Sequence, residues 1–184
     1  MATEIHFGTS GWRAVLADEF TFANVRRAVT GIARYVVSQK ASGARIIVGR
    51  DSRFLGETFC SMADEILTAH GITPLLIAEP VPTPAISYAV IREKADGAIN
   101  FTASHNPPEY NGIKFSTPDG APALPDATTR IDAAITARHA DPRRPNATGK
   151  ARATPGKPEP CTAAHPGGPT GGWARRPASV GAQL

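Results

Sequence analysis

The chain has 184 residues, of which 41% are apolar and 20% charged, a composition typical of a globular protein. It contains no apolar run of about 18 residues and does not open with a basic segment followed by an apolar one, so we expect a cytoplasmic chain without a membrane span or signal peptide. The net charge of +4 comes from residues 136–184, and their arginines are not interleaved with aromatic residues, so we expect no nucleic-acid partner.

The first two elements are predicted from apolar spacing. A helix is indicated after Thr21, its expected N-cap, because apolar residues recur there at intervals of three and four: Val25, Ala28, Val29, Ile32, Ala33 and Val36. The short apolar run 45–49 then predicts a buried strand that ends in a glycine.

The middle of the chain repeats this order. A second helical face covers residues 59–67 and is closed by Gly71, and a strand is predicted over 72–78. Pro82-Thr83-Pro84 then opens a third predicted helix, whose apolar residues are Ala85, Tyr88, Ala89 and Ile91.

The last elements are two strands and a helix. Residues 97–101 predict a third buried strand, residues 113–116 a short strand at a sheet edge, and residues 127–135 a final helix. Residues 136–184 follow with eight prolines and seven glycines, a composition that buries too little apolar surface to fold. We therefore expect a folded domain over 1–135 and a disordered tail over 136–184.

Strands separated by single helices predict the α/β class, as a three-layer α/β/α domain around a mixed, mostly parallel sheet. Ligands of such sheets bind beyond the carboxyl ends of the strands. Three loops leave such ends, at residues 49–53, 79–84 and 102–111, and we expect the chemistry to lie there.

The loop at 102–111 contains Ser104 beside two polar neighbours. The His105 imidazole can donate a hydrogen bond to a phosphate, Asn106 adds an amide, and two prolines stiffen the exit. No hydrolase triad or GxSxG elbow accompanies the serine. From the residues alone, a catalytic site and a polar turn both stay open.

Lys114 follows an Asn-Gly turn signal that includes Asn111, so its strand is expected to fold back beside the serine. An amine close to a transferring phosphoryl group can act as acid or base. The alternative is a solvated lysine on an edge strand.

Two other loops carry arginines. Residues 7–13 combine glycines, which let backbone amides approach an anion, with Arg13, which can hold a phosphate bidentately; a structural glycine turn is the alternative. In the loop 49–53, Arg50 and Asp51 are expected to pair with each other in a structural role.

Together these segments resemble the α-D-phosphohexomutase family of phosphoglucomutases and phosphomannomutases. The matching segments, which lie between about residues 4 and 135, are FGTSGWR at 7–13, VGRDSR at 48–53, PVPTPA at 80–85 and TASHNPPEYNGIK at 102–114.

The resemblance implies that Ser104 carries a phosphoryl group, donates it to a hexose monophosphate and recovers the other phosphate from the hexose bisphosphate intermediate. Lys114 would be the general acid or base, and Arg13 and His105 would support the transfer. Four further residues would bind phosphate or sugar: Thr9, Ser10, Asn106 and Asn111. The resemblance also implies Mg²⁺ bound partly by the phosphorylated serine.

Members of that family have four domains, and their DGDxDR metal loop and two sugar- and phosphate-binding loops have no counterpart in this sequence. The resemblance thus implies a mutase domain that is inactive alone. Two alternatives are a non-catalytic binding or regulatory remnant, and an enzyme whose other domains come from another polypeptide. The tail is either a shifted reading frame or a natural linker.

Overall fold

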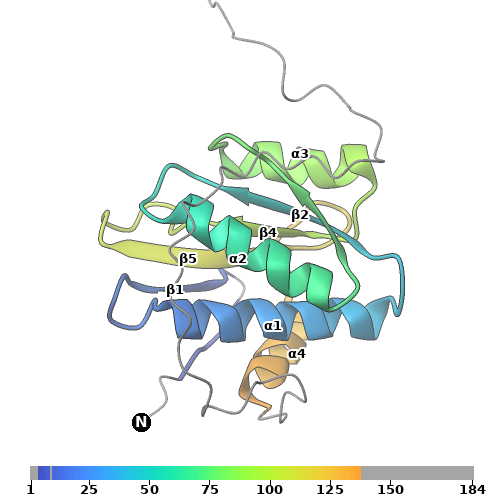
Figure 1. The fold of residues 1–184 in the computed structure, drawn as a ribbon, viewed down its shortest axis with the longest axis horizontal. Helices are drawn as coiled ribbons and strands as arrows, with labels where there is room; N and C mark the ends of the chain where they lie inside the picture. The colour runs from blue at the N-terminus through green and yellow to red at the C-terminus, as the bar shows by residue number, and fades with distance from the viewer. Residues whose placement is uncertain (1–3, 9, 138–184) are drawn as a thin grey trace, which may run out of the picture.

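The computed structural model describes residues 4–8 and 10–137. Within these ranges the chain forms one five-stranded sheet and four helices (Figure 1). In chain order the elements are β1 Trp12–Val15, α1 Phe22–Gln39, β2 Arg45–Arg50, α2 Gly56–Ala69, β3 Thr73–Leu76, α3 Thr83–Glu93, β4 Ala98–Phe101, β5 Tyr110–Ser116 and α4 Pro125–Thr136.

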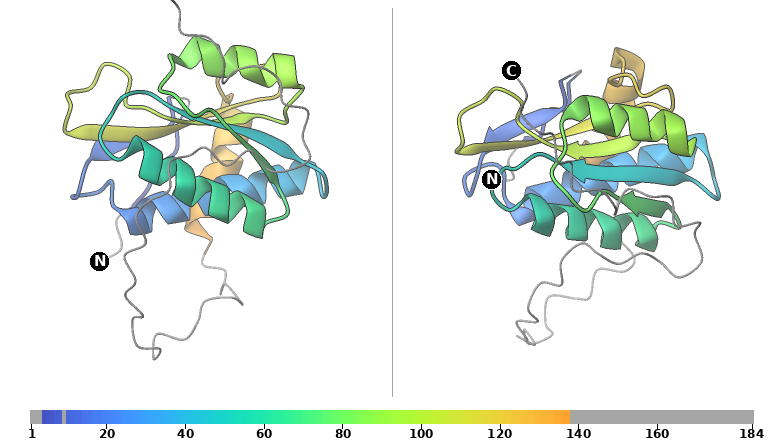
Figure 2. Two further views of the ribbon diagram at one scale, coloured as in Figure 1. Left: turned by 45° about the horizontal axis from the view of Figure 1, so that its top comes forward. Right: turned by 90° about the horizontal axis from the view of Figure 1, so that it is seen from above.

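The sheet has the strand order β1-β5-β4-β2-β3 and is mixed. β2 pairs in parallel with β3 and with β4, whereas β5 pairs antiparallel with β4 and with β1. Helix α3 covers one face of the sheet, and α1 and α2 cover the other, with α4 packed against α1 (Figures 1 and 2). The predicted three-layer α/β/α class is confirmed.

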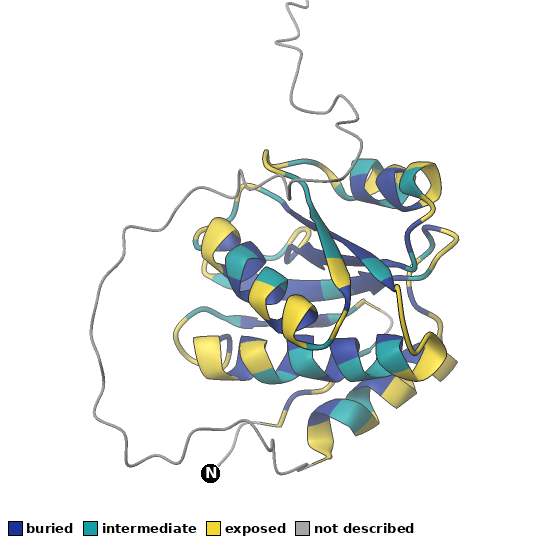
Figure 3. Ribbon diagram, turned by 45° about the vertical axis from the view of Figure 1, so that its right-hand side comes forward, coloured by how far each residue is buried: buried dark blue, intermediate teal, exposed yellow. Residues whose placement is uncertain are grey.

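The predicted helices form for the reasons expected from the sequence. Thr21 caps α1, because its hydroxyl accepts a hydrogen bond from the Asn24 amide at 3.3 Å. Gly71, with a φ of +74°, follows the end of α2. Each helix presents a buried stripe to the sheet or to a neighbouring helix (Figure 3). In α3 that stripe is Ile86, Ala89 and Val90, whereas Tyr88 and Ile91 are exposed.

Residues 113–116 form a strand as predicted, within β5, but the prediction that this strand lies at a sheet edge is wrong. β5 lies between β4 and β1, and β1 takes the edge position. β1 was not predicted because its four residues begin inside the glycine-rich segment 7–13, which is too short and polar to show strand alternation.

None of the described helices is both long and apolar enough to cross a bilayer. The predicted tail, residues 136–184, lies almost wholly outside the described residues, which end at 137.

Candidate active site at the Ser104 loop

The Ser104 loop, defined as residues 102–110 and so including the first residue of β5, follows the carboxyl end of β4, as predicted. Ser104 is exposed and has a φ of +57°, the left-handed conformation, which costs a residue with a side chain about 1 kcal/mol. The Asn106 amide donates to the Ala103 carbonyl at 3.1 Å, which closes a tight turn around the serine. The Ser104 hydroxyl therefore stands on a turn that needs support from its surroundings.

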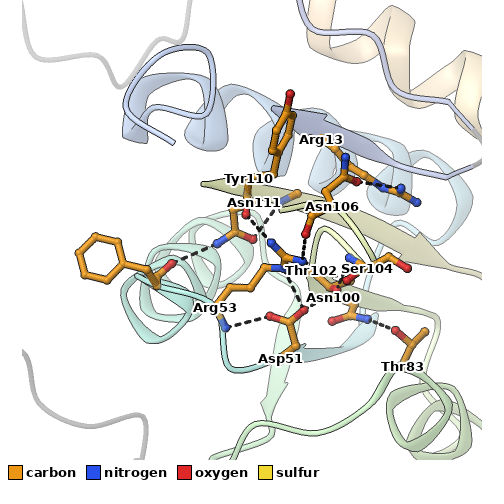
Figure 4. Close-up of polar contacts among 12 residues, drawn as sticks. Arg13, Asp51, Arg53, Thr83, Asn100, Thr102, Ser104, Asn106, Tyr110 and Asn111 are labelled. Carbon is orange, nitrogen blue, oxygen red and sulfur yellow. Dashed lines mark hydrogen bonds and ion pairs between the residues drawn. The ribbon is translucent and has the colours of Figure 1, made fainter. Parts of the chain in front are cut away.

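The first support comes from the loop after β2. The Thr102 hydroxyl donates to Asp51 Oδ2 at 2.6 Å and accepts from the Ser104 amide at 2.9 Å. The other carboxylate oxygen of Asp51 accepts from the Arg53 amide at 3.0 Å. The ends of the neighbouring parallel strands β2 and β4 are thus joined by hydrogen bonds (Figure 4).

The second support is Arg53, which was not among the residues predicted to form the site. Its guanidinium donates four hydrogen bonds of 2.7–3.0 Å to backbone carbonyls of the loop, those of Ser104, Asn106, Pro107 and Tyr110. Figure 4 labels each of these partners except Pro107. Its Nε lies 3.5 Å from Asp51 Oδ2. The motif VGRDSR contains this arginine, but its partners lie 51–57 positions further along the chain and no local pattern indicates them.

Arg13 and Lys114 approach from the antiparallel strands. Arg13 on β1 donates from Nη1 to Asn106 Oδ1 at 3.1 Å, and its Nε is buried without a partner. Its Cα partner on β5 is Gly112, two residues before Lys114, so both side chains lie on one face of the sheet. The strand of Lys114 thus folds back along β4, the strand that leads into the serine loop, and Arg13 contacts that loop through Asn106.

The pKa of Lys114 is held below its usual value of 10.5. Partial burial of the amine is the largest cause, and the Arg13 guanidinium lowers the pKa further, whereas the Asp51 carboxylate raises it. A larger fraction of this lysine is therefore neutral near physiological pH than of an ordinary lysine.

The predicted loop at residues 79–84 is connected to the site by a hydrogen bond to β4. Asn100, opposite Lys114 in the β4–β5 register, donates from Nδ2 to the Thr83 hydroxyl at 3.0 Å. Its Oδ1 is buried and has no partner. The start of α3 is thus tied to the strand that carries the serine loop.

The other predicted site residues differ in their surroundings. His105 and Ser10 are exposed, and Thr9 lies outside the described residues. Asn111 is fully buried: its Nδ2 donates to the Phe54 carbonyl at 3.1 Å, and its Oδ1 accepts from the Gly112 amide at 2.8 Å. These contacts favour a structural role for Asn111 over the phosphate contact predicted from the sequence.

The prediction that Arg50 pairs with Asp51 is wrong, because Arg50 bonds to other residues. Buried Arg50 instead donates to Glu57 Oε1 at 2.7 Å and to the Ala78 carbonyl at 3.1 Å. The two side chains of consecutive residues leave β2 in opposite directions, so they reach different neighbours. The structural role expected for Arg50 agrees with these contacts.

The described residues do not gather a cluster of carboxylates that could enclose Mg²⁺. No group of three or more His, Cys, Asp or Glu side chains among them could hold a metal ion. Both carboxylate oxygens of Asp51, which lies next to the serine loop, already bond to Thr102 and Arg53. The present donor set therefore does not fit a complete Mg²⁺ site.

Residues 4–141 match the family model described as phosphoglucomutase/phosphomannomutase, alpha/beta/alpha domain I. The phosphoglucosamine mutase of Deinococcus deserti is 39% identical over 137 residues, which cover 73% of this chain and 30% of that protein. The phosphoglucomutase of Staphylococcus saprophyticus is 32% identical over 133 residues, covering 69% of this chain and 23% of that protein.

Solved structures of proteins named as phosphomannomutase and phosphoglucomutase are similar to this chain over about three quarters of its length. A putative phosphomannomutase from Thermus thermophilus superposes with a TM-score of 0.70 at 39% identity, covering 73% of this chain and 30% of that one. The phosphoglucomutase parafusin from Paramecium superposes with a TM-score of 0.68 at 26% identity, covering 74% and 26%. The chain spans about a quarter to a third of the length of these relatives.

Proposed function

Because the chain belongs to the phosphoglucomutase/phosphomannomutase family through its α/β/α domain I, we propose that Ser104 carries the phosphoryl group in an interconversion of hexose 1-phosphate and hexose 6-phosphate. The observation that carries the proposal is the arrangement around Ser104. Exposed Ser104 lies in a turn that is held by hydrogen bonds at the carboxyl end of β4. Arg13 lies on β1, and Lys114, whose pKa is lowered, lies on the adjacent strand β5.

In the first half-reaction, a hydroxyl of the hexose monophosphate attacks the phosphorus of phosphorylated Ser104. The bond between phosphorus and Ser104 Oγ breaks, a bond to the sugar oxygen forms, and a hexose bisphosphate results, while the exposed Ser104 Oγ takes a proton from solvent as it leaves. The hydroxyl proton must leave, and the neutral amine of Lys114 is the base we assign to it, because its lowered pKa raises the neutral fraction.

In the second half-reaction, Ser104 Oγ loses its proton to solvent and takes the other phosphoryl group of the bisphosphate, and protonated Lys114 returns a proton to the sugar oxygen that leaves. Arg13 stabilises the charge on the transferring group, and its bond to Asn106 fixes its direction. We assign the exposed His105 to the same group as a hydrogen-bond donor.

The residues around Ser104 support a role in phosphoryl transfer, and none of the described residues is assigned to the choice of sugar. We therefore propose that this chain supplies the phosphoryl carrier and that sugar selection needs segments beyond residues 4–137. Mg²⁺, which the resemblance implies, would neutralise phosphate charge when bound. The only ligand we assign to it here is phosphorylated Ser104, and no step above depends on it.

The direct test is phosphorylation of the purified chain by glucose 1,6-bisphosphate, followed by intact mass and peptide mapping. We expect one phosphoryl group on Ser104, none on Ser104→Ala, and normal labelling of Ser52→Ala, a control that removes an exposed serine of the neighbouring loop. Labelling of Ser104→Ala at the wild-type level would refute the assignment.

A mutase assay on the same chain tests whether the domain is sufficient. We expect no turnover of glucose 1-phosphate to glucose 6-phosphate, and robust turnover would contradict the division of labour proposed above. A chain that takes no phosphoryl group but captures a specific protein partner would favour the alternative, a non-catalytic binding or regulatory remnant.

A further inference from the structure

Arg53 binds more of the Ser104 loop than any other side chain for which the structure gives contacts. Nη1 donates to the carbonyls of Pro107 and Tyr110, each at 2.8 Å, and Nη2 donates to those of Ser104 at 3.0 Å and Asn106 at 2.7 Å. Four of the five N–H donors of the guanidinium are thereby used on one short loop.

These bonds fix the direction in which the loop carbonyls point. Every C=O group that bonds to Arg53 turns its negative end inward, toward the guanidinium. In Figure 4 the Ser104 side chain extends away from Arg53. A phosphoryl group carries negative charge, so carbonyl oxygens that pointed toward it would repel it. Because these carbonyls point toward Arg53, their oxygens do not face a phosphoryl group on the Ser104 hydroxyl.

We infer that Arg53 is a positioning residue for phosphoryl transfer, which holds the loop so that Ser104 keeps its left-handed backbone and its carbonyl faces away from the phosphoryl group. The inference rests on the proposed function. Arg53 reaches the reaction through the loop backbone and is not itself assigned a contact with substrate.

The planar geometry of the guanidinium matters for this role. A lysine at position 53 would place a single ammonium with three donors at the end of its chain, which cannot reach four carbonyls spread over residues 104–110. Asp51 orients the arginine from the other side through the 3.5 Å approach to Nε. Arg53→Lys is therefore the informative substitution, because it keeps the positive charge and removes the planar guanidinium with its two Nη groups.

Arg50→Lys is the matched control. Arg50 comes from the same strand end, and it donates to Glu57 and to the Ala78 carbonyl rather than to the serine loop. A loss of general stability should appear in both variants, whereas a loss of loop geometry should appear in Arg53→Lys alone.

The experiment compares wild type, Arg53→Lys and Arg50→Lys by two measurements. For Arg53→Lys we expect the rate of Ser104 phosphorylation by glucose 1,6-bisphosphate to fall about tenfold to a hundredfold. We also expect amide hydrogen exchange to accelerate about tenfold in residues 102–112 but not in β2 or β4. Arg50→Lys should retain the wild-type phosphorylation rate and loop exchange, even where its melting temperature falls.

Phosphorylation of Arg53→Lys within twofold of wild type would overturn the inference. So would an acceleration of exchange spread evenly over the domain. If the wild-type chain takes no phosphoryl group, the proposed function fails, and loop exchange alone then decides whether Arg53 holds the loop.

A measurement on the wild type covers the case in which Arg53→Lys does not fold. Four bonded Nη protons should give separate, slowly exchanging guanidinium NMR signals for Arg53, unlike those of exposed Arg26. Averaged Arg53 signals indistinguishable from those of Arg26 would overturn the inference.

Discussion

The Thr102 hydroxyl lies 2.6 Å from the Asp51 carboxylate and connects the loop that follows β2 to the loop that contains Ser104. Thr102 is buried, and the same hydroxyl oxygen accepts from the Ser104 amide. One side-chain oxygen therefore serves two loops that are about 50 residues apart in the chain.

Replacing Thr102 with valine tests this connection, because valine keeps the shape of threonine and removes the hydroxyl. We expect the free energy of unfolding to fall by about 1–3 kcal/mol, since the Ser104 amide loses its partner and Asp51 Oδ2 keeps only the 3.5 Å approach of Arg53 Nε, both at part-buried positions. Urea denaturation followed by circular dichroism measures the change. Thr102→Ser keeps the hydroxyl and should lose less than half as much; equal losses would show that the methyl group, not the hydrogen bond, is responsible.

The sequence predicted what depends on local pattern. The apolar spacing of α1, the cap at Thr21 and the place of Ser104 at the end of a buried strand all follow from neighbouring residues, and all appear in the structure. The edge assignment of residues 113–116 failed because it required knowing that β1 pairs with β5, a contact between residues about 100 positions apart.

The role of Arg53 could not be predicted for a related reason. Its sequence neighbours place it in a strand-end loop, but four of its bonds go to backbone carbonyls, which every residue type has. A pattern of side chains carries no information about such contacts. The same holds for Asn111, which lies inside β5 rather than in the turn that the Asn-Gly pair predicted, and whose burial comes from the position of β5 between β4 and β1.

The lowered pKa of Lys114 should respond in opposite directions to two neighbouring substitutions. Arg13→Gln removes a cause of the lowering, so the pKa of Lys114 should rise toward 10.5, whereas Asp51→Asn removes a stabilising charge, so the pKa should fall further. The pH dependence of acetic anhydride labelling at Lys114, normalised to exposed Lys94, measures both. Shifts in the same direction would contradict the assigned causes.

The same lysine should make stability depend on pH. Between the lowered pKa of Lys114 in the folded chain and 10.5 in the unfolded chain, the unfolded state binds more protons, so the free energy of unfolding should rise with pH across that interval. Below the folded-state pKa the partly buried ammonium lowers stability. Lys114→Met should remove this rise, which denaturation at a series of alkaline pH values can detect; an unchanged slope would assign the dependence to other groups.

Gly11 sets the distance between β1 and β5 and thereby the position of Arg13. Its φ is +79°, and a Cβ built there would overlap the Ile113 carbonyl oxygen, a backbone atom that cannot move without shifting the strand. Gly43 has a similar φ of +68° but nothing within 4 Å of its Cβ position, so Gly43→Ala isolates the cost of the backbone conformation, about 1 kcal/mol.

We therefore expect Gly11→Ala to lower the free energy of unfolding by at least about 2 kcal/mol more than Gly43→Ala, because it adds a steric clash to the same backbone cost. Displacement of β1 would also move Arg13 away from Lys114, so the labelling pKa of Lys114 should rise in Gly11→Ala and stay unchanged in Gly43→Ala. Chemical denaturation and lysine labelling of the two variants provide both comparisons. Equal losses of stability, with no change at Lys114, would mean that β1 moves without cost and does not fix the position of Arg13.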